Sequence, residues 1–299
     1  MIKTIPADEY HDSPGLSASL AKTLLAKSPL HAWLESPMNP ARSRQDASRL
    51  DIGTAAHAAL LEGLDVVTVC DFGDWRTKDS KAARDEARAA GKIPLLTHQY
   101  AQVRDMVTVA RDALAGCPDL NGIKWEDGKA EQSIFWSPGN DVRCRSRLDW
   151  LANDHSLILD YKTTELGPDS WIRSIPKMGY DIQAAFYLRG LEAQRETTDT
   201  KKTDFVFMVQ EAEAPYMVYF VGLPAAYLEI GAAKVQIAID RWTACMERGE
   251  WPGYEKRIMW ADCPSWAIAD VEEKMSMQEE WLKAAFLFGR VPDKRKKND

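Results

Sequence analysis

The spacing of apolar residues predicts that the first part of the chain is mainly helical. Apolar side chains recur every three or four residues in segments 17–34, 48–61 and 97–114, a period typical of helices that bury one face. Ser17 is of a residue type favoured at helix N-termini, so we expect it to cap the first helix. Segment 80–90 alternates positive and negative side chains and predicts an exposed helix.

The pattern changes after Gly128, where short apolar segments replace the helical period. These segments are rich in β-branched and aromatic residues and are separated by Gly, Pro, Asn and Asp, which predicts strands. A helix is expected over residues 180–194 and a long one over 225–248. The order of elements predicts an α/β (α+β) fold, in which a helical N-terminal part precedes a central mixed β-sheet flanked by helices. The expected strands are 133–136, 142–151, 156–161, 205–210 and 217–221.

We expect one large domain over residues 1–255, with a helical part over 1–125 and a sheet-containing core over 126–255. Residues 256–299 are expected to form a helical extension and a solvated basic tail that includes Lys294–Lys297.

Composition predicts a cytoplasmic protein without a membrane segment. Hydrophobic residues make up 45% of the 299 residues and charged residues 28%, a balance typical of soluble globular proteins. No apolar run approaches the ~20 residues that a membrane-spanning helix needs, and the N-terminus lacks a signal-peptide core. The five cysteines are scattered and contain no C-x-x-C pair, which favours a reducing compartment and argues against a disulfide framework.

The net charge of −7 bears on the possible partners. Proteins that coat DNA tend to be basic because they contact many phosphates. An enzyme, however, can be acidic outside and basic along one channel, and metal-binding carboxylates add negative charge of their own. The charge therefore argues against a general DNA-coating protein but leaves a nuclease open.

Two carboxylates and a lysine are expected to meet on one hairpin. A turn centred on Asp154 and His155 would place Asp149 directly opposite Asp160, with Cβ atoms ~5 Å apart. Lys162 lies two residues further along and shares the face of Asp160. Paired carboxylates attract a hard cation such as Mg²⁺ or Mn²⁺, which can activate water and orient a phosphodiester. From these residues alone, a surface hairpin with a cross-strand ion pair remains an alternative.

Further residues, in chain order, resemble the PD-(D/E)XK nucleases of the RecB type. They are Gly53-x-x-x-His57, Glu131, Arg147-Leu148-Asp149, Asp160-Tyr161-Lys162-Thr163-Thr164 and Gln183-x-x-x-Tyr187. The chain is similar above all to the RecE family, the nuclease domain of exodeoxyribonuclease VIII, over about residues 10 to 255. That likeness is carried by Gly15–Ser19, Leu50–His57, Cys144–Asp149, Asp181–Tyr187 and Phe205–Val209.

The resemblance implies that a metal centre is built around the hairpin. Asp149, Asp160 and the backbone carbonyl of Tyr161 would be metal ligands, and Lys162 would be the catalytic lysine. His57 would approach the metal from its helix, although a single helical histidine can also be a packed core residue.

The resemblance implies roles for six further positions. Glu131 would add a carboxylate, directly or through water, although a carboxylate at a strand start is often only solvated. Gln183 and Tyr187 lie one helical turn apart and would flank the scissile phosphate or the attacking water. Arg147, Ser17 and Ser19 are candidates for holding a 5′ phosphate, and Ser17 can equally do no more than cap its helix.

The activity implied by the resemblance is that of a Mg²⁺-dependent exodeoxyribonuclease with two ions per site, for which Mn²⁺ substitutes. It would degrade one strand of linear double-stranded DNA processively, from 5′ to 3′, and leave 3′ single-stranded tails for recombination. The implied assembly is a homo-oligomeric ring, a tetramer rather than a trimer, that works with a RecT-like single-strand annealing protein, in a phage or host setting. The alternatives are a single-strand or flap endonuclease of the same superfamily and a non-catalytic DNA-binding recombination scaffold.

Three further sequence features bear on this expectation. Leu148 stands where many family members have Gly or Pro before the first aspartate, so the local backbone is expected to differ. The C-terminal region has only Cys245 and Cys263, too far apart for the closely spaced set of an iron–sulfur cluster. No P-loop sequence is present, so no ATPase motor is expected.

Overall fold

The computed structural model describes residues 2–42, 52–139, 142–195 and 202–288. The chain divides into two compact units, Met1–Gly253 and Tyr254–Asp299. The first unit holds the sheet and the candidate site, and the second holds one described helix.

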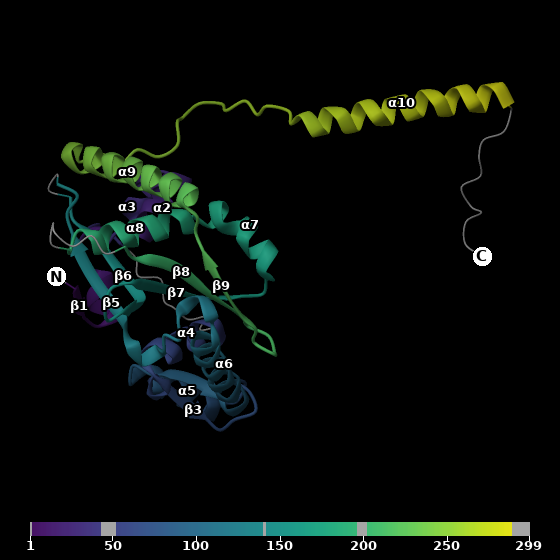
Figure 1. Ribbon diagram of the computed structural model, residues 1–299. Helices are drawn as coiled ribbons and strands as arrows, with labels where there is room; N and C mark the ends of the chain where they lie inside the picture. The colour runs from purple at the N-terminus through teal and green to yellow at the C-terminus, as the bar shows by residue number, and fades with distance from the viewer. Residues whose placement is uncertain (1, 43–51, 140–141, 196–201, 289–299) are drawn as a thin grey trace. The chain divides into compact units, whose positions relative to one another are not determined.

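A mixed sheet forms the centre of the first unit and has seven strands within the described residues (Figure 1). β2 (Leu16–Ser17) pairs with β6 in parallel, and β7 pairs with β8 in parallel, whereas the other neighbouring strands are antiparallel. This arrangement confirms the predicted central mixed sheet. Apart from β2, the strands lie in the order β1 (Ile2–Thr4), β5 (Gly128–Trp136), β6 (Cys144–Ala152), β7 (Leu157–Thr164), β8 (Asp204–Glu211) and β9 (Val218–Gly222).

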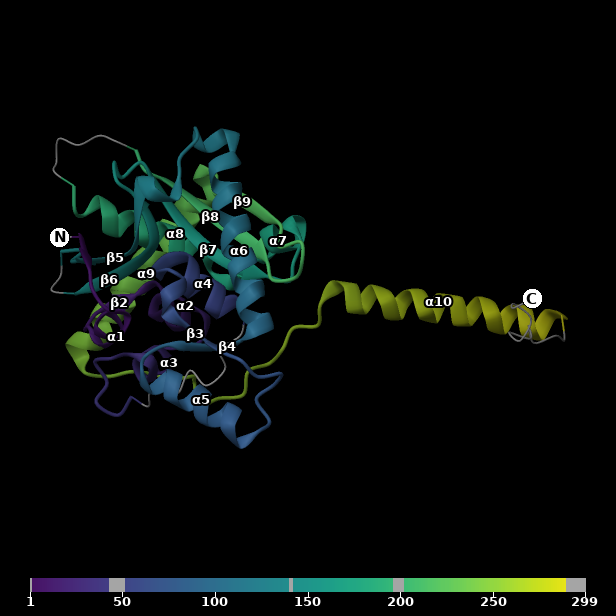
Figure 2. The same ribbon diagram turned by 90° about the horizontal axis from the view of Figure 1, so that it is seen from below.

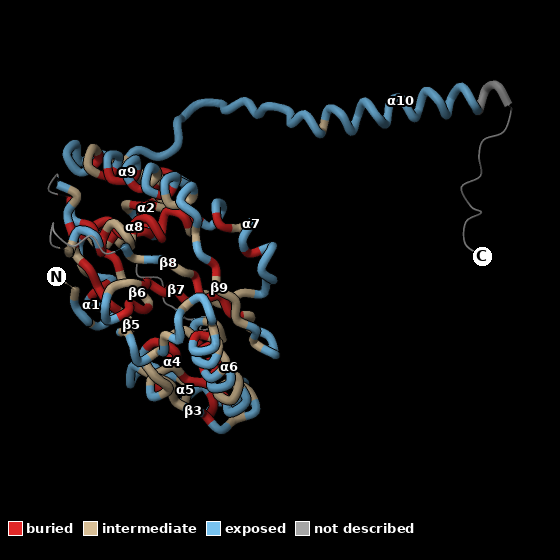
Figure 3. Tube along the Cα trace, in the orientation of Figure 1, coloured by how far each residue is buried: buried red, intermediate tan, exposed pale blue. Residues whose placement is uncertain are grey.

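Helices cover both faces of the sheet. The first face carries α2 (Ala18–Ala26), α8 (Tyr180–Glu192) and α9 (Ala225–Arg248), and the opposite, second face carries α4 (Ile52–Glu62) and α6 (Thr97–Gly116) (Figure 1). Figure 2 views the second face, with α4 and α6 in front of the strands. The inner sides of these helices and the strands between them are buried (Figure 3).

The two faces differ in the side chains that fill them. The core of the first face is rich in large aromatic rings: Trp136, Trp171, Phe186, Phe205, Phe207 and Trp242. The core of the second face is mostly alanine and branched aliphatic residues, with Trp150 and Tyr161 contributed by the sheet.

Smaller elements complete the unit. β3 (Val67–Cys70) and β4 (Ile93–Leu96) form a separate parallel pair. Short 3₁₀ turns occur at Leu64–Val66, Pro118–Leu120 and Trp125–Asp127. The other helices are α1 (Ala7–Asp12), α3 (Pro29–Glu35), α5 (Lys78–Ala89) and α7 (Pro168–Met178).

The predicted helix over residues 17–34 is wrong in one respect, because it is two helices. α2 begins after Ser17, whose hydroxyl accepts the Leu20 N–H as predicted. It ends at Ala26, and α3 starts with Pro29 as its first residue. Proline has no N–H to continue a preceding helix but suits the first turn of a new one, and the Ser28 hydroxyl caps that turn.

Two other predictions fall partly or wholly outside the described residues. The start of the predicted helix 48–61 lies there, and the described part of that helix begins at Ile52. The basic tail Lys294–Lys297 also lies outside them.

Two glycines allow α8 to approach its neighbours closely. A Cβ on Gly231 of α9 would lie 2.3 Å from the backbone oxygen of Asp181 in α8. A Cβ on Gly190 of α8 would lie 2.8 Å from Trp136 Nε1 on the sheet. Since such separations are shorter than atoms tolerate, a side chain at Gly231 would push α9 away from α8, and one at Gly190 would push α8 away from the sheet.

The second unit contains α10 (Ser265–Phe288). Its described side chains are mostly exposed, including the apolar residues Trp266, Val271, Met275 and Met277. Among the residues that the structure describes, no helix is both long and apolar enough to cross a membrane.

Candidate active site

The site lies where strand β6 changes its partner. The start of β6 pairs with β2, through Leu16 with Cys144 and Ser17 with Arg145. The end of β6 pairs with β7, through Trp150 with Leu159 and Leu151 with Ile158. Along this edge, residues 146–149 lie between the two partner strands.

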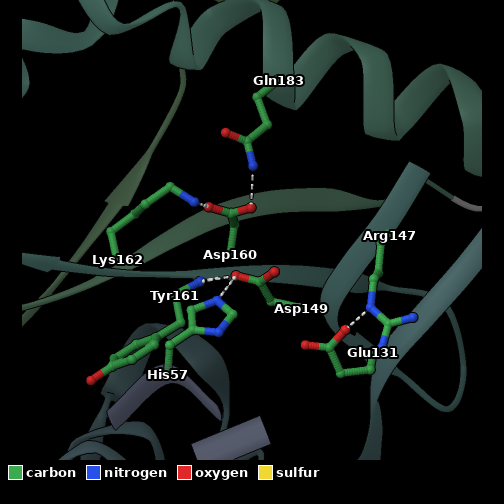
Figure 4. A network of polar contacts seen from close by, with 8 residues as sticks. All are labelled: His57, Glu131, Arg147, Asp149, Asp160, Tyr161, Lys162 and Gln183. Carbon is green, nitrogen blue, oxygen red and sulfur yellow. Dashed lines mark hydrogen bonds and ion pairs between the residues drawn. The ribbon is translucent and has the colours of Figure 1, made fainter. Parts of the chain in front are cut away.

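The hairpin register is the predicted one, with the turn centred between Asp154 and His155. Its next pair would be Asp149 with Asp160, but the pairing ends one step earlier, at Trp150 with Leu159. Instead, the backbone N–H of Tyr161 donates to Oδ2 of Asp149 at 2.9 Å (Figure 4). The two aspartates therefore face the same opening, although they are not a regular cross-strand pair.

Glu131 marks a second irregularity, on the other side of β6. Its neighbours pair in register, Ala130 with Trp150 and Gln132 with Leu148, whereas Glu131 has φ +57°. This left-handed conformation is costly for a residue with a side chain and is typical of functional sites. The Glu131 carboxylate forms an ion pair with Arg147, and both side chains are largely buried. Burial raises the pKa of Glu131, and the charge of Arg147 opposes that rise.

Asp149 is oriented from the second face of the sheet by His57, which projects from α4. The His57 Nε2 atom lies 3.2 Å from Asp149 Oδ2 (Figure 4). Burial alone would raise the pKa of Asp149, but the hydrogen bond and charge of His57, together with the charge of Lys162, hold it below its ordinary value. Burial lowers the pKa of His57, but the same contact with Asp149 raises it above the usual value overall.

Asp160 is held from the first face of the sheet. Its carboxylate is fully buried, forms an ion pair with Lys162 through Oδ1, and accepts the amide Nε2 of Gln183 through Oδ2 at 2.5 Å (Figure 4). Burial, opposed by Lys162 and reinforced by the like charge of Asp149, raises the pKa of Asp160 to about 6. Burial lowers the pKa of Lys162, but the charges of Asp160 and Asp149 raise it above its ordinary value.

Gln183 and Tyr187 lie one turn apart on α8, as predicted, and both face the site. Gln183 contacts Asp160 directly. Tyr187 packs against Phe205, with ring centroids 6.3 Å apart. Burial, with the charge of Asp160, raises the pKa of Tyr187 well above its ordinary value, so its phenol is a neutral donor.

A cavity of about 500 Å³ joins the site to the predicted phosphate-binding residues. The first turn of α2 borders this cavity, and Ser17 also caps that helix. Arg147 borders it too, while its guanidinium donates to the Ile5 carbonyl at 2.8 Å. Lining residues include Ser17, Ser19, His57, Glu131, Arg145, Arg147, Asp149 and Tyr187.

The candidate metal ligands are paired with cationic or hydrogen-bonding partners. Within the described residues, no group of three or more His, Cys, Asp or Glu side chains is arranged to hold a metal ion. Asp149 contacts His57, Asp160 contacts Lys162, and Glu131 contacts Arg147. For Tyr161, the contact with Asp149 is made by the backbone N–H, whereas its side-chain hydroxyl donates to Gln210.

The donor set nonetheless fits a hard divalent cation. Asp149 and Asp160 repel one another strongly enough to contribute to the raised pKa of Asp160. A divalent cation between them would neutralise both, and carboxylate oxygens with one imidazole are suitable ligands.

Sequence reasoning missed Lys22, which projects from α2 into the same network. Its Nζ donates to Gln183 Oε1 at 3.0 Å and lies 5.3 Å from the centroid of the Tyr180 ring. Burial and the charge of Lys162 lower the pKa of Lys22 to about 8. One signal in the sequence was available: Lys22 follows Ala18 by four residues and so belongs to the face of α2 that packs inward.

The mixed sheet, the aspartates of adjacent strands and the neighbouring lysine define a PDDEXK-like domain, the fold of a large class of nucleases. The family model described as "PDDEXK-like domain of unknown function (DUF3799)" matches residues 17–261, and the chain belongs to this family. The membership confirms the predicted PD-(D/E)XK fold and is consistent with the RecE-type resemblance.

One solved structure shows the same fold. A crystal structure of a proposed exonuclease from Eubacterium rectale aligns with a TM-score of 0.56 and 12% identity, over 89% of this chain and 98% of that one. A second structure, SSO0001, aligns with a TM-score of 0.27 and 13% identity, over 56% of this chain and 67% of that one, which is too low to compare folds. The curated proteins contain no match to the chain.

Proposed function

We propose that this protein is a divalent-metal-dependent exodeoxyribonuclease that hydrolyses one strand of linear double-stranded DNA from its end. The observation that carries the proposal is that Asp149, Asp160 and Lys162 lie together where the pairing of β6 changes from β2 to β7. The family description and the fold likeness to a proposed exonuclease support it.

The residues that would hold the metal are Asp149, Asp160, His57 and the backbone carbonyl of Tyr161, with Glu131 as a further carboxylate. We propose Mg²⁺ as the natural ion, with Mn²⁺ as a substitute and two ions per site. When bound, such an ion polarises the phosphodiester and lowers the pKa of the attacking water.

The other side chains would bind and orient the phosphodiester. Lys162 is a cation beside Asp160, so it is suited to stabilise negative charge that develops on the phosphate. Gln183 and the neutral phenol of Tyr187 are hydrogen-bond donors on the same helix face and would position the scissile phosphate or the attacking water.

The cavity beside the metal site would hold the 5′ end of the strand. The N-terminus of α2 borders it, and helix N-termini attract anions. Ser19 and Arg147 line the same space, and Ser17 could serve there in addition to its capping role. Recognition of a terminal 5′ phosphate would select ends and set the 5′ to 3′ direction that leaves 3′ tails.

We also propose a homo-oligomeric ring of four subunits that passes its 3′ tails to a RecT-like annealing protein. The RecE-type resemblance supports both. A ring around the substrate would allow processive digestion without a motor.

The test uses linear duplex DNA labelled separately at each 5′ and 3′ end, together with a closed circular duplex. With Mg²⁺ or Mn²⁺, we expect early release of the 5′ label, a protected circle, and no digestion in chelator. Asp160→Ala should abolish digestion, and unchanged digestion by this variant would exclude the proposed centre. Cleavage of the closed circle would favour an endonuclease instead.

A further inference from the structure

Lys22 reaches the active site from a different part of the chain than the hairpin. It lies on α2, and its partner Gln183 lies on α8, 161 positions further along the sequence. The two helices pack side by side on the first face of the sheet (Figure 1). The contact of Lys22 with Gln183 therefore depends on the folded arrangement and not on a local motif.

The absence of a side chain at Gly179 leaves space for the aliphatic part of Lys22. Gly179, between α7 and α8, has φ +63° and no side chain. A Cβ there would lie 3.1 Å from Lys22 Cγ and 3.2 Å from Lys22 Cδ, which is tighter than ordinary contact. The charged end of Lys22 then lies over the ring of Tyr180, where a cation is favourably placed.

The contact determines how the Gln183 amide is oriented. A lysine ammonium only donates hydrogen bonds, so Lys22 must face the amide oxygen of Gln183. The amide NH₂ is thereby directed to the carboxylate of Asp160. Without Lys22, the amide oxygen of Gln183 would lose its donor, and only the carboxylate of Asp160 would still hold the NH₂ group.

We propose that Lys22 is a positioning residue of the active site, which acts through Gln183 by holding its amide NH₂ toward Asp160 and the reacting phosphate. This inference rests on the proposed nuclease activity. It adds α2 to the elements that build the centre, since α2 then contributes a side chain to the centre as well as its N-terminus to the adjoining cavity.

The test compares Lys22→Met with wild type and with Lys22→Arg in the full-length protein. Methionine keeps an unbranched apolar stem and removes the donor, whereas arginine retains a donor and a charge. Loss of a charged hydrogen bond of about 1.5 kcal/mol predicts that Lys22→Met lowers kcat about tenfold, with KM changed less than about twofold. Lys22→Arg should recover part of that loss. Lys27→Met is the matched control, because Lys27 is exposed at the end of the same helix, and it should behave as wild type.

A double variant separates positioning from an independent role. If Lys22 acts through Gln183, the kcat of Lys22→Met combined with Gln183→Ala should equal that of Gln183→Ala alone. Multiplicative losses would overturn the proposal, because they would mean that Lys22 contacts the substrate or supports the fold by itself. An unchanged kcat in Lys22→Met would also overturn it.

A spectroscopic measurement makes the inference testable apart from catalysis. The side-chain NH₂ resonances of Gln183, assigned by their loss in Gln183→Ala, should be well dispersed in wild type. In Lys22→Met they should move toward the values of a solvated amide, and in Lys27→Met they should stay in place. If the resonances do not move in Lys22→Met, Lys22 does not position Gln183. If wild type fails to digest DNA although the resonances move, the nuclease proposal fails while the contact itself stands.

Discussion

The two faces of the central sheet contribute different kinds of side chain to one site. From the first face, Gln183 is directed at Asp160, whose carboxylate is completely buried, and Lys22 fixes the amide. From the second face, His57 contacts Asp149, and both of these side chains are partly exposed, at 37% and 14%. The first face therefore holds a carboxylate in a buried hydrogen-bond network, and the second presents one to the adjoining cavity.

This difference has a physical origin in how the faces are packed. The aromatic layer of the first face excludes water from Asp160, which raises its pKa to about 6 and makes a counter-charge necessary. Asp149 instead borders the cavity together with His57 of α4. Two aspartates on adjacent strands thus have pKa values shifted in opposite directions.

Among the variants that compare the two faces, the largest effect is expected at Lys162, whose ammonium is paired with Asp160. Lys162→Met removes the cation beside both carboxylates and should lower kcat/KM about 10²–10³-fold, the usual cost of removing a charge-stabilising donor from an active site. Digestion of linear duplex in Mg²⁺ measures it, and a calorimetric Mg²⁺ titration provides the control, since the carboxylates remain. Activity near that of wild type would mean that Lys162 serves only to balance the charge of Asp160.

His57→Ala tests the second face and should have an intermediate effect. The variant removes a proposed metal ligand that also contacts Asp149. The metal concentration needed for half-maximal rate should therefore rise by at least about 10–100-fold, the cost of losing a residue that orients a metal ligand. A titration of activity against Mg²⁺ measures this rise. Gln183→Ala, on the first face, should lower the maximal rate without that shift. Equal metal dependence in the two variants would erase the distinction between the faces.

Gly231→Ala tests the packing of the first face. The added methyl group would contact the backbone of Asp181, so α9 and α8 must separate, at a cost of about 1–3 kcal/mol. Thermal unfolding should show a lowered Tm. Gly249→Ala is unsuitable as a comparison because its φ is +66°, whereas Gly222→Ala meets no neighbouring atom within 4 Å and should be milder.

Tyr161→Phe tests the packing of the second face and should have the smallest effect. It removes the hydroxyl that donates to the buried Gln210 but leaves the backbone N–H that contacts Asp149. The free energy of unfolding should fall by about 1–2 kcal/mol, because Gln210 loses a partner, while nuclease activity stays unchanged. A large loss of activity would show that the Tyr161 ring, and not only its backbone, is needed at the centre.

The parts of the site that could be predicted from the sequence are those with local causes. The turn at Asp154 and His155 sets the hairpin register, and helical spacing places Gln183 and Tyr187 on one face. Ser28 followed by Pro29 also contained the signal for the break between α2 and α3, although the continuous apolar spacing concealed it.

The rest depends on contacts between distant segments. The left-handed backbone of Glu131 has no signal in its residue type, since glycine or asparagine would be expected there. The contact of Lys22 with Gln183 requires α2 and α8 to be packed together. Tertiary packing also pairs Asp160 with Lys162, Asp149 with His57 and Glu131 with Arg147. The sequence alone suggested that the three carboxylates would gather around one metal site, whereas each contacts a different basic side chain.

The exchange of partners by β6 gives the sheet an edge in its interior. Sheet edges normally lie at the periphery, where proteins protect their main-chain donors and acceptors from other chains. Here the unpaired edge belongs to β6 and lies between β2 and β7, inside the molecule. Ser17 of β2 flanks it on one side and Tyr161 of β7 on the other. The opening beside residues 146–149 is therefore set by where the strand pairing stops and starts again. Evolution or design could replace the lining residues, and so change what is cleaved, without rebuilding the frame.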